Sequence, residues 1–133
     1  MGIFYVLIAK KTNVILCDYT SHTGNFQEIV MQLLNQITPG TAKTLELEDY
    51  LFHYIHENGL LCLCMADKDV TKKLAFSFLQ DVRQCFLDKH STHDIEVAGG
   101  FGLKSFGNIY MKPKMNFYNE NPDCSNDKAD ELL

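Results

Sequence analysis

The hydrophobic pattern divides the first forty residues into two strands and one helix. Residues 3–9 are a continuous apolar run rich in β-formers, which indicates a central strand covered on both faces. Residues 14–19 predict a second strand after a short polar turn, so the two strands should form a hairpin. A helix is then expected, opened by a capping-box variant of Asn25 and Glu28 and ended by Pro39-Gly40. Its apolar face comprises Phe26, Ile29, Val30, Leu33 and Ile37.

Three more strands and a long helix are predicted next. Residues 43–48 alternate, with Lys43, Leu45 and Leu47 on one side. Residues 50–56 and 60–65 flank Asn58-Gly59, a strong hairpin signal. Asp67 and Asp69 are candidate caps for the helix that follows. The apolar face of this helix comprises Leu74, Ala75, Phe78, Leu79, Val82, Cys85 and Phe86.

The pattern weakens after His90. A last helix is predicted from the spacing of Leu103, Phe106, Ile109 and Tyr110, and Pro113 is expected to stop it. Residues 116–130 are rich in Asn and Asp, as in a linker or a frayed tail. We therefore expect one α/β (α+β) domain over residues 1–112 and a polar tail over 113–133. Short turns between strands predict a mostly antiparallel five-stranded sheet, with one helix on one face and two on the other.

Composition restricts the kind of protein. The 133 residues suit one domain, and 46% hydrophobic residues suit a packed core. The net charge is −5 and no basic stripe is visible, which argues against nucleic acid or an anionic bilayer as the main partner. Five cysteines without framework spacing indicate reduced thiols in the cytosol. No apolar run approaches the roughly 18 residues of a membrane span, so we expect no membrane insertion by this segment.

The best candidate metal ligands are four side chains around the Asn58-Gly59 turn. If this pair forms a two-residue turn, His53 lies opposite Cys64, and alternation places His53, Cys62 and Cys64 on one face with His56 on the other. Cys62 and Cys64 are then roughly 6–7 Å apart, whereas two thiolates at about 2.3 Å from one zinc ion must lie closer together. We expect buried thiols beside a hydrogen-bonded histidine, and no metal or other cofactor.

Other catalytic patterns lack their structural context. Residues 99–102 (GGFG) are glycine-rich but follow a polar connector, whereas a dinucleotide loop joins a strand to a helix. Cys17 with His22, and Ser91 with His93, are near in sequence without a recognisable nucleophile motif. We expect a binding module rather than an enzyme.

Apolar side chains beside the core stripe give the most specific candidate site. Met31 and Leu34 lie next to the apolar face of the first helix, and Leu45 and Leu47 belong to the following strand. They either cover a thick edge of the core or line a groove for an apolar helix or extended peptide. Pattern alone leaves both interpretations open.

Four strings in order resemble the longin domain of R-SNAREs in the vesicle-associated membrane protein family. They are GNFQEI (Gly24 to Ile29), DYLFHYI (Asp49 to Ile55), LCLCMADKD (Leu61 to Asp69) and AFSFLQDVRQCF (Ala75 to Phe86). The resemblance spans residues 3–112. It implies a profilin-like fold that agrees with the sandwich predicted above.

The resemblance also implies a function. Longin domains of R-SNAREs fold back on their own SNARE motif, restrain SNARE assembly and bind other SNAREs and trafficking adaptors. The implied partner groove holds Met31, Leu34, Leu45 and Leu47. The implied location is the cytosolic face of vesicle, endosomal or Golgi-derived membranes, and we expect a monomer.

Two features depart from the family pattern. The last predicted helix is glycine-rich, and the sequence reaches Leu133 without SNARE heptads or an anchor. Residues 127–133 (DKADELL) fit the start of a SNARE motif, whereas a free-standing longin protein, or a longin-like subunit of an adaptor or tethering complex, fits as well. These alternatives stay open.

Overall fold

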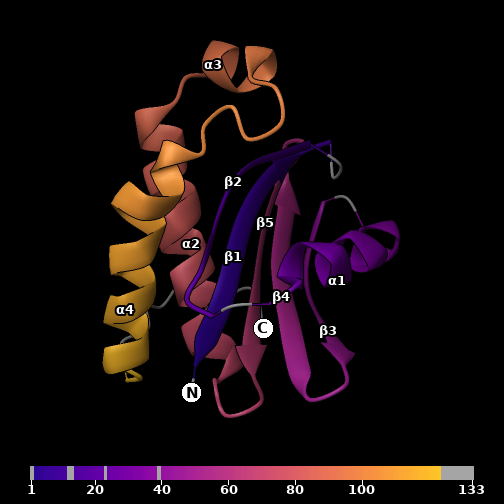
Figure 1. Cartoon of the computed structure of the whole chain (residues 1–133), viewed down its shortest axis with the longest axis vertical. Helices are drawn as coiled ribbons and strands as arrows, with labels where there is room; N and C mark the ends of the chain where they lie inside the picture. Colours follow the sequence, from indigo (N-terminus) through magenta and orange to yellow (C-terminus); the bar gives the residue numbers. More distant parts are fainter. Residues whose placement is uncertain (1, 12–13, 23, 39, 124–133) are drawn as a thin grey trace.

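The computed structural model describes residues 2–11, 14–22, 24–38 and 40–123, and these form an antiparallel five-stranded sheet with helices on both faces (Figure 1). The strands run in the order β2-β1-β5-β4-β3, and every neighbouring pair is antiparallel. The predicted fold class is confirmed. The strands are β1 (Ile3–Lys10), β2 (Val14–Thr20), β3 (Thr41–Leu47), β4 (Tyr50–Glu57) and β5 (Leu60–Asp67).

Strand β1 lies in the interior of the sheet between β2 and β5. Its continuous apolar run follows from this position, because side chains on both faces are buried from Ile3 to Ala9. The first face carries α1 (Phe26–Leu33) and the short 3₁₀ helix η1 (Leu34–Gln36). The second carries α2 (Lys72–Lys89), the π-helical turn η2 (Gly107–Met111) and α4 (Lys112–Glu120).

The two faces have separate cores. The α1 face buries Phe4, Leu7, Val30, Leu33, Phe52, Tyr54, Leu61 and Leu63, among others. The α2 face buries Val6, Ile8, Cys62, Cys64, Phe78, Leu79, Phe86, Phe106 and Met115, among others. Alternate residues of β1 and β5 therefore serve opposite cores, as strand geometry requires.

The β4–β5 turn fixes the register as the sequence predicts. Asn58 and Gly59 have φ values of +54° and +74°, the left-handed conformations of a type I′ turn. His53 then pairs with Cys64, and His56 pairs with Leu61. The register predicted from the Asn-Gly pair is confirmed.

The predicted helix caps need correction. Asn25 is the N-cap of α1 but its side chain caps no helix amide, and its Nδ2 instead donates to Glu28 Oε2 at 3.3 Å. The N-cap of α2 is Thr71, whose Oγ1 accepts from the Leu74 amide at 3.1 Å. Asp67 and Asp69 are not the caps, because Asp67 is the last residue of β5 and Asp69 lies in the loop before Thr71.

The C-terminal helices differ most from the prediction. The helix α3 (Thr92–Val97) was not predicted, although Ser91 and Asp94 form a complete capping box at its start. The expectation that Pro113 stops the last helix is wrong, because Pro113 lies in the first turn of α4, where its missing N–H costs nothing.

Helix α4 therefore crosses the predicted domain boundary at residue 112. It continues to Glu120 and buries Met115 and Tyr118 against α2 and the sheet. Residues 116–120 belong to this helix and not to a tail. The stretch 127–133, which fits the start of a SNARE motif, lies outside the described residues.

The segment before α4 covers one edge of the sheet. The amide of Phe101 donates to Ile15 O at 2.6 Å, and that of Leu103 donates to Leu16 O at 3.1 Å. The glycine-rich stretch 99–102 is thus a connection that runs along β2. Strand β3 is the opposite edge of the sheet.

Candidate protein-binding surface

The candidate surface lies on the α1 face, where the β3–β4 hairpin sets which side chains face α1. Leu45 pairs with Phe52, and Leu47 pairs with Tyr50. Phe52 belongs to the α1-side core, and Leu45 packs against that core. Because side chains alternate along a strand, Leu47 and Tyr50 project to the same side.

The four predicted groove residues differ in exposure. Met31 on α1 is 47% exposed, and Leu47 on β3 is 36% exposed. Leu45 is half-buried. Leu34 is only 9% exposed and belongs to the core below α1, so it contributes support rather than contact area.

The burial of Leu34 has a geometric cause. The α-helix ends at Leu33, and residues 34–36 form a 3₁₀ turn. Leu34 follows Val30 by four residues, so an α-helical rotation of about 100° per residue places it only about 40° from this fully buried side chain. The core face of the helix therefore extends to Leu34.

Two exposed aromatic rings, Tyr50 and His22, pack on buried Phe4, extend the surface and were missed by sequence reasoning. The Phe4 ring packs edge-on against Tyr50 at 5.7 Å between centroids, and against His22 at 4.7 Å. Tyr50 is 38% exposed, whereas Phe4 is buried. The sequence could have indicated Tyr50, because a two-residue turn at Glu48-Asp49 pairs Tyr50 with Leu47.

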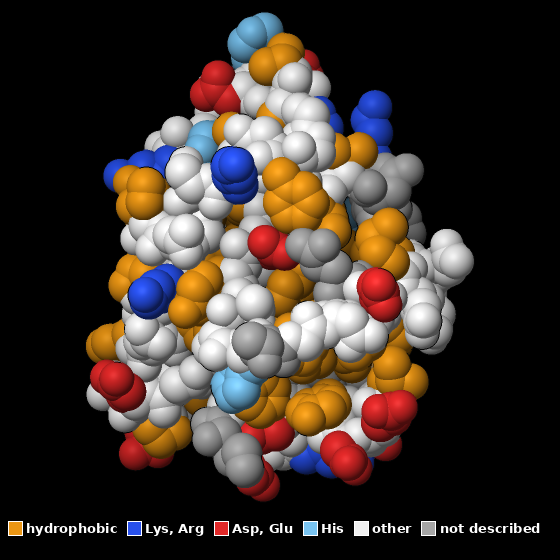
Figure 2. Space-filling model, viewed as in Figure 1, with side chains coloured by type: hydrophobic (Ala, Val, Ile, Leu, Met, Phe, Trp, Pro, Cys, Tyr) orange, Lys and Arg blue, Asp and Glu red, His pale blue; other side chains and the backbone are white. Residues whose placement is uncertain are grey.

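Figure 2 shows the molecular surface from the same viewpoint as Figure 1. Apolar side chains gather at the lower right, over the end of the sheet formed by β3 and β4, with acidic side chains at their margin. The acids of this hairpin include Glu46, Glu48 and Asp49, all exposed. Glu46 also reaches Lys68 at 3.6 Å, an exposed pair that contributes little stability.

The residues considered as metal ligands are part of the core. His53 Nδ1 hydrogen-bonds with Thr44 Oγ1 at 2.8 Å, and its ring packs edge-on against Phe76. Burial lowers the pKa of His53 to about 4, with a smaller contribution from Lys72, so the ring is neutral. His56 lies on the other face, as predicted from the register.

The two thiols on this face are held in their neutral form. Burial raises the pKa of Cys62 to about 12, although the Arg83 cation acts in the opposite direction. Burial also raises the pKa of Cys64 well above the usual value. Metal binding needs thiolates, so these groups suit a core role. Among the residues that the structure describes, no three potential ligands converge.

The candidate nucleophiles are placed in structural roles. Cys17 is buried, and desolvation raises the pKa of its thiol. Ser91 Oγ accepts from the Asp94 amide at 3.1 Å as the cap of α3. His22 Nδ1 hydrogen-bonds with Ser21 Oγ at 2.8 Å. The Ser91 and His22 side chains thus form local hydrogen bonds, and the Cys17 thiol is enclosed in the core.

The described helices include none that is both long and apolar enough to cross a bilayer.

Comparison with known proteins places this chain in a family. Residues 16–109 match the longin family, described as a regulated-SNARE-like domain. The chain belongs to the longin family.

Relatives with high similarity carry related names. Vesicle-associated membrane protein 7B of Dictyostelium discoideum is 33% identical over 119 residues, which cover 89% of this chain and 45% of that protein. Vesicle-associated membrane protein 712 of Arabidopsis thaliana is 29% identical over 93% of this chain and 57% of its own length. Vesicle-associated membrane protein 7 of Mus musculus is 30% identical over 91% and 54%, respectively. The chain thus spans about half the length of these relatives.

Proposed function

We propose that this chain is the regulatory, protein-binding domain of an R-SNARE that acts in vesicle trafficking and membrane fusion. Membership of the longin family and the names of the relatives support this role. The observation that carries the proposal is that Leu47 and Tyr50 are exposed beside half-buried Leu45 on the α1 side of the β3–β4 hairpin, while Met31 is exposed on α1 itself. It supplies contact area that the core of the domain does not use.

The proposed occupant is an apolar helical or extended segment. It is the SNARE motif of the same protein, or the equivalent segment of another SNARE or a trafficking adaptor. Covering the exposed side chains recovers about 25 cal/mol per Å² of apolar area. A tethered motif binds at a high effective concentration, so a weak surface suffices to restrain SNARE assembly.

The proposal includes location and chemistry. The domain acts as a monomer on the cytosolic face of vesicle, endosomal or Golgi-derived membranes, without a cofactor and without catalysis. A binding role is supported by the structural roles of the candidate reactive side chains: Cys17 packs in the core, Ser91 caps α3 and His53 hydrogen-bonds with Thr44.

The test replaces exposed surface residues by a charged residue. Met31→Glu and Leu47→Glu should each weaken binding of a synthetic R-SNARE-motif peptide at least about tenfold, because a buried unpaired charge costs well over 1.4 kcal/mol. The melting temperature should change little, since both side chains are exposed. Binding is measured by calorimetric titration and folding by circular dichroism.

A matched control is Ile109→Glu, which changes an apolar residue that is 58% exposed on η2, on the other face. It should bind the peptide like the unaltered chain. Leu45→Glu gives a second measurement: loss of peptide binding with the fold intact supports the groove, and melting of the domain assigns Leu45 to the core. Unchanged binding by Met31→Glu and Leu47→Glu would contradict the proposal.

The alternative is a longin-like subunit of an adaptor or tethering complex, or a free-standing longin protein. The coding sequence after Leu133 distinguishes the R-SNARE from these alternatives. Apolar heptads with one central arginine, followed by a membrane span, support the R-SNARE. A stop codon near Leu133, or a domain without coiled-coil heptads, supports the alternative.

A further inference from the structure

A cavity lies at the end of the sheet beside α3, away from the α1 face. Its volume is about 710 Å³, within the range of small-molecule sites. The walls come from the β1–β2 and β4–β5 turns, the last turns of α2, and α3. The Lys11 amide donates to Gly59 O at 3.1 Å, so the two turns are held together. Figure 1 shows α3 above this end of the sheet, at the top of the view.

The charge of the cavity lining is opposite to that of the whole protein. Lys10, Lys11 and Arg83 line it with one carboxylate, Glu96, which gives a net formal charge of +2. The complete chain carries −5. Because surface charge of one sign in a concave site raises the local concentration of the opposite ion, this cavity favours a dianion.

Arg83 supplies a cation at the wall of the cavity. Its Nε atom is buried and has no hydrogen-bond partner among the described residues. Because Nε is closed to solvent, a ligand in the cavity would meet the terminal guanidinium nitrogens of this side chain. Arginine also recognises phosphate oxygens by charge-assisted hydrogen bonds.

Lys10 fixes the position of α3 over the cavity. Its Nζ donates to the carbonyl oxygens of Ile95 and Glu96 at 3.0 and 2.8 Å. These bonds engage carbonyl groups at the C-terminal end of α3 and leave the positive charge unneutralised by them. The same side chain therefore joins the wall of the cavity and contributes to its potential.

The remaining lining is apolar. Leu60 is buried, Ile95 is half-buried, and Leu87 is 38% exposed on α2. A fully hydrated inorganic ion would leave these side chains uncovered. A ligand with an apolar part would cover the exposed parts of Ile95 and Leu87 and gain hydrophobic free energy, whereas Leu60 is already buried.

We propose that this cavity binds an amphiphilic phosphate monoester, with the phosphate at Arg83 and Lys11 and the apolar part against Ile95 and Leu87. The ligand is either a free molecule or the exposed headgroup region of a lipid. This site is separate from the surface proposed to bind SNARE segments.

The probe is n-octyl phosphate, used below its micelle concentration with the complete 133-residue chain. Calorimetric titration should show one site. The amide NMR signals of Asn58, Gly59 and Thr92, which line the cavity, should shift. Inorganic phosphate and n-octanol should each bind at least about tenfold more weakly, because the first lacks the alkyl chain and the second lacks the phosphate group.

Two variants and one control locate the site. Arg83→Gln should weaken octyl phosphate binding at least about tenfold by removing the charge-assisted bonds. Leu87→Asp should have a similar effect by placing a negative charge at the wall, and its exposure makes it compatible with folding. Lys112→Gln changes an exposed lysine outside the cavity and should bind like the unaltered chain.

Vesicles distinguish the two sources of the ligand. Retention on phosphatidylcholine vesicles that contain phosphatidic acid, lost in Arg83→Gln, assigns the phosphate to a lipid headgroup. Binding of octyl phosphate without vesicle retention assigns it to a free molecule. The proposal is overturned if octanol binds as tightly as octyl phosphate, if folded Arg83→Gln binds normally, or if the shifted signals lie outside the cavity.

Discussion

At the scale of single residues, Gly107 allows η2 to approach the edge strand β2. A Cβ atom at this position would meet the carbonyl oxygen of Asp18, a contact that real Cβ atoms do not make. The obstacle is backbone, which cannot rotate away as a side chain can. The glycine that lowers helix propensity is therefore required for packing.

Replacing Gly107 by alanine should destabilise the protein by about 1–3 kcal/mol, the usual cost of overpacking a well-filled site. Gly100→Ala is the matched control, since a Cβ there meets nothing within 4 Å. Its effect should stay within about 0.5 kcal/mol. Urea denaturation measures both. Equal stability of the two variants would show that β2 and η2 can separate at no cost.

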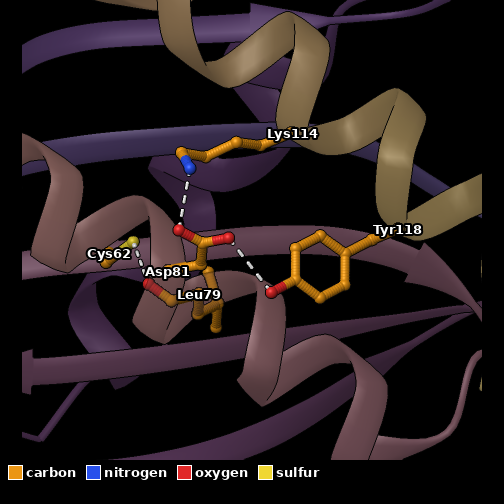
Figure 3. A network of polar contacts seen from close by, with 5 residues as sticks. All are labelled: Cys62, Leu79, Asp81, Lys114 and Tyr118. Carbon is orange, nitrogen blue, oxygen red and sulfur yellow. Dashed lines mark hydrogen bonds and ion pairs between the residues drawn. The ribbon is translucent and has the colours of Figure 1, made fainter. Parts of the chain in front are cut away.

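At the scale of elements, one carboxylate joins α2 to α4. Asp81 on α2 accepts from Lys114 Nζ at 2.8 Å and from Tyr118 Oη at 3.1 Å, as Figure 3 shows. The Tyr118 ring also packs edge-on against Phe78, with 5.6 Å between the ring centroids. Polar and apolar contacts thus hold α4 to the same helix.

Replacing Asp81 by alanine should loosen α4 without opening the sheet. Amide hydrogen exchange in residues 112–120 should accelerate about tenfold, which corresponds to the loss of roughly 1–2 kcal/mol of hydrogen bonding. Exchange in β5 should stay slow. Asp88→Ala serves as control, because Asp88 is exposed on α2 and accepts a local bond from Gln84 on the same helix. Uniform acceleration across the domain would indicate global destabilisation instead.

Elements with a local signal were predictable, and those set by tertiary contact were not. Asn58-Gly59 specifies the β4–β5 register because its turn type needs positive φ at both residues. The prediction at Pro113 was wrong because proline can end a helix but is also common in the first turn of one, where Pro113 lies in α4. The glycines before α4 lowered its helical signal, although contact with β2 requires one of them.

The candidate surface was predictable in part for similar reasons. Alternation in β3 identified Leu45 and Leu47 on the α1 side. Leu34 was assigned to the surface because it lies at the margin of the apolar arc, although its spacing of four residues from Val30 places it on the buried face. The cavity beside α3 had no sequence signal, since its residues come from four separate elements.

At the scale of the whole molecule, α4 also secures the first strand. Asn119 Oδ1 accepts from the Ile3 amide at 2.9 Å, and its Nδ2 donates to Ile3 O at 3.1 Å. These bonds join residues 116 positions apart. The C-terminal helix is therefore part of the domain.

Ending the chain at residue 112 should severely destabilise it. The truncation removes Met115 and Tyr118, whose burial contributes about 1.5–3 kcal/mol each, against a typical total stability of 5–15 kcal/mol. A chain of residues 1–123 retains every described element and is the control. Thermal melting compares the two. Equal melting temperatures would place α4 outside the cooperative unit.

The interior position of β1 has a consequence for synthesis on the ribosome. This strand is made first, yet one of its two neighbours is β5, whose last residue is Asp67. During synthesis of α1, β3 and β4, the edge of β1 that later pairs with β5 therefore has no hydrogen-bonding partner strand. Such an apolar edge is prone to pair with other chains. The nascent domain is thus most exposed to chaperones and to aggregation before β5 leaves the exit tunnel.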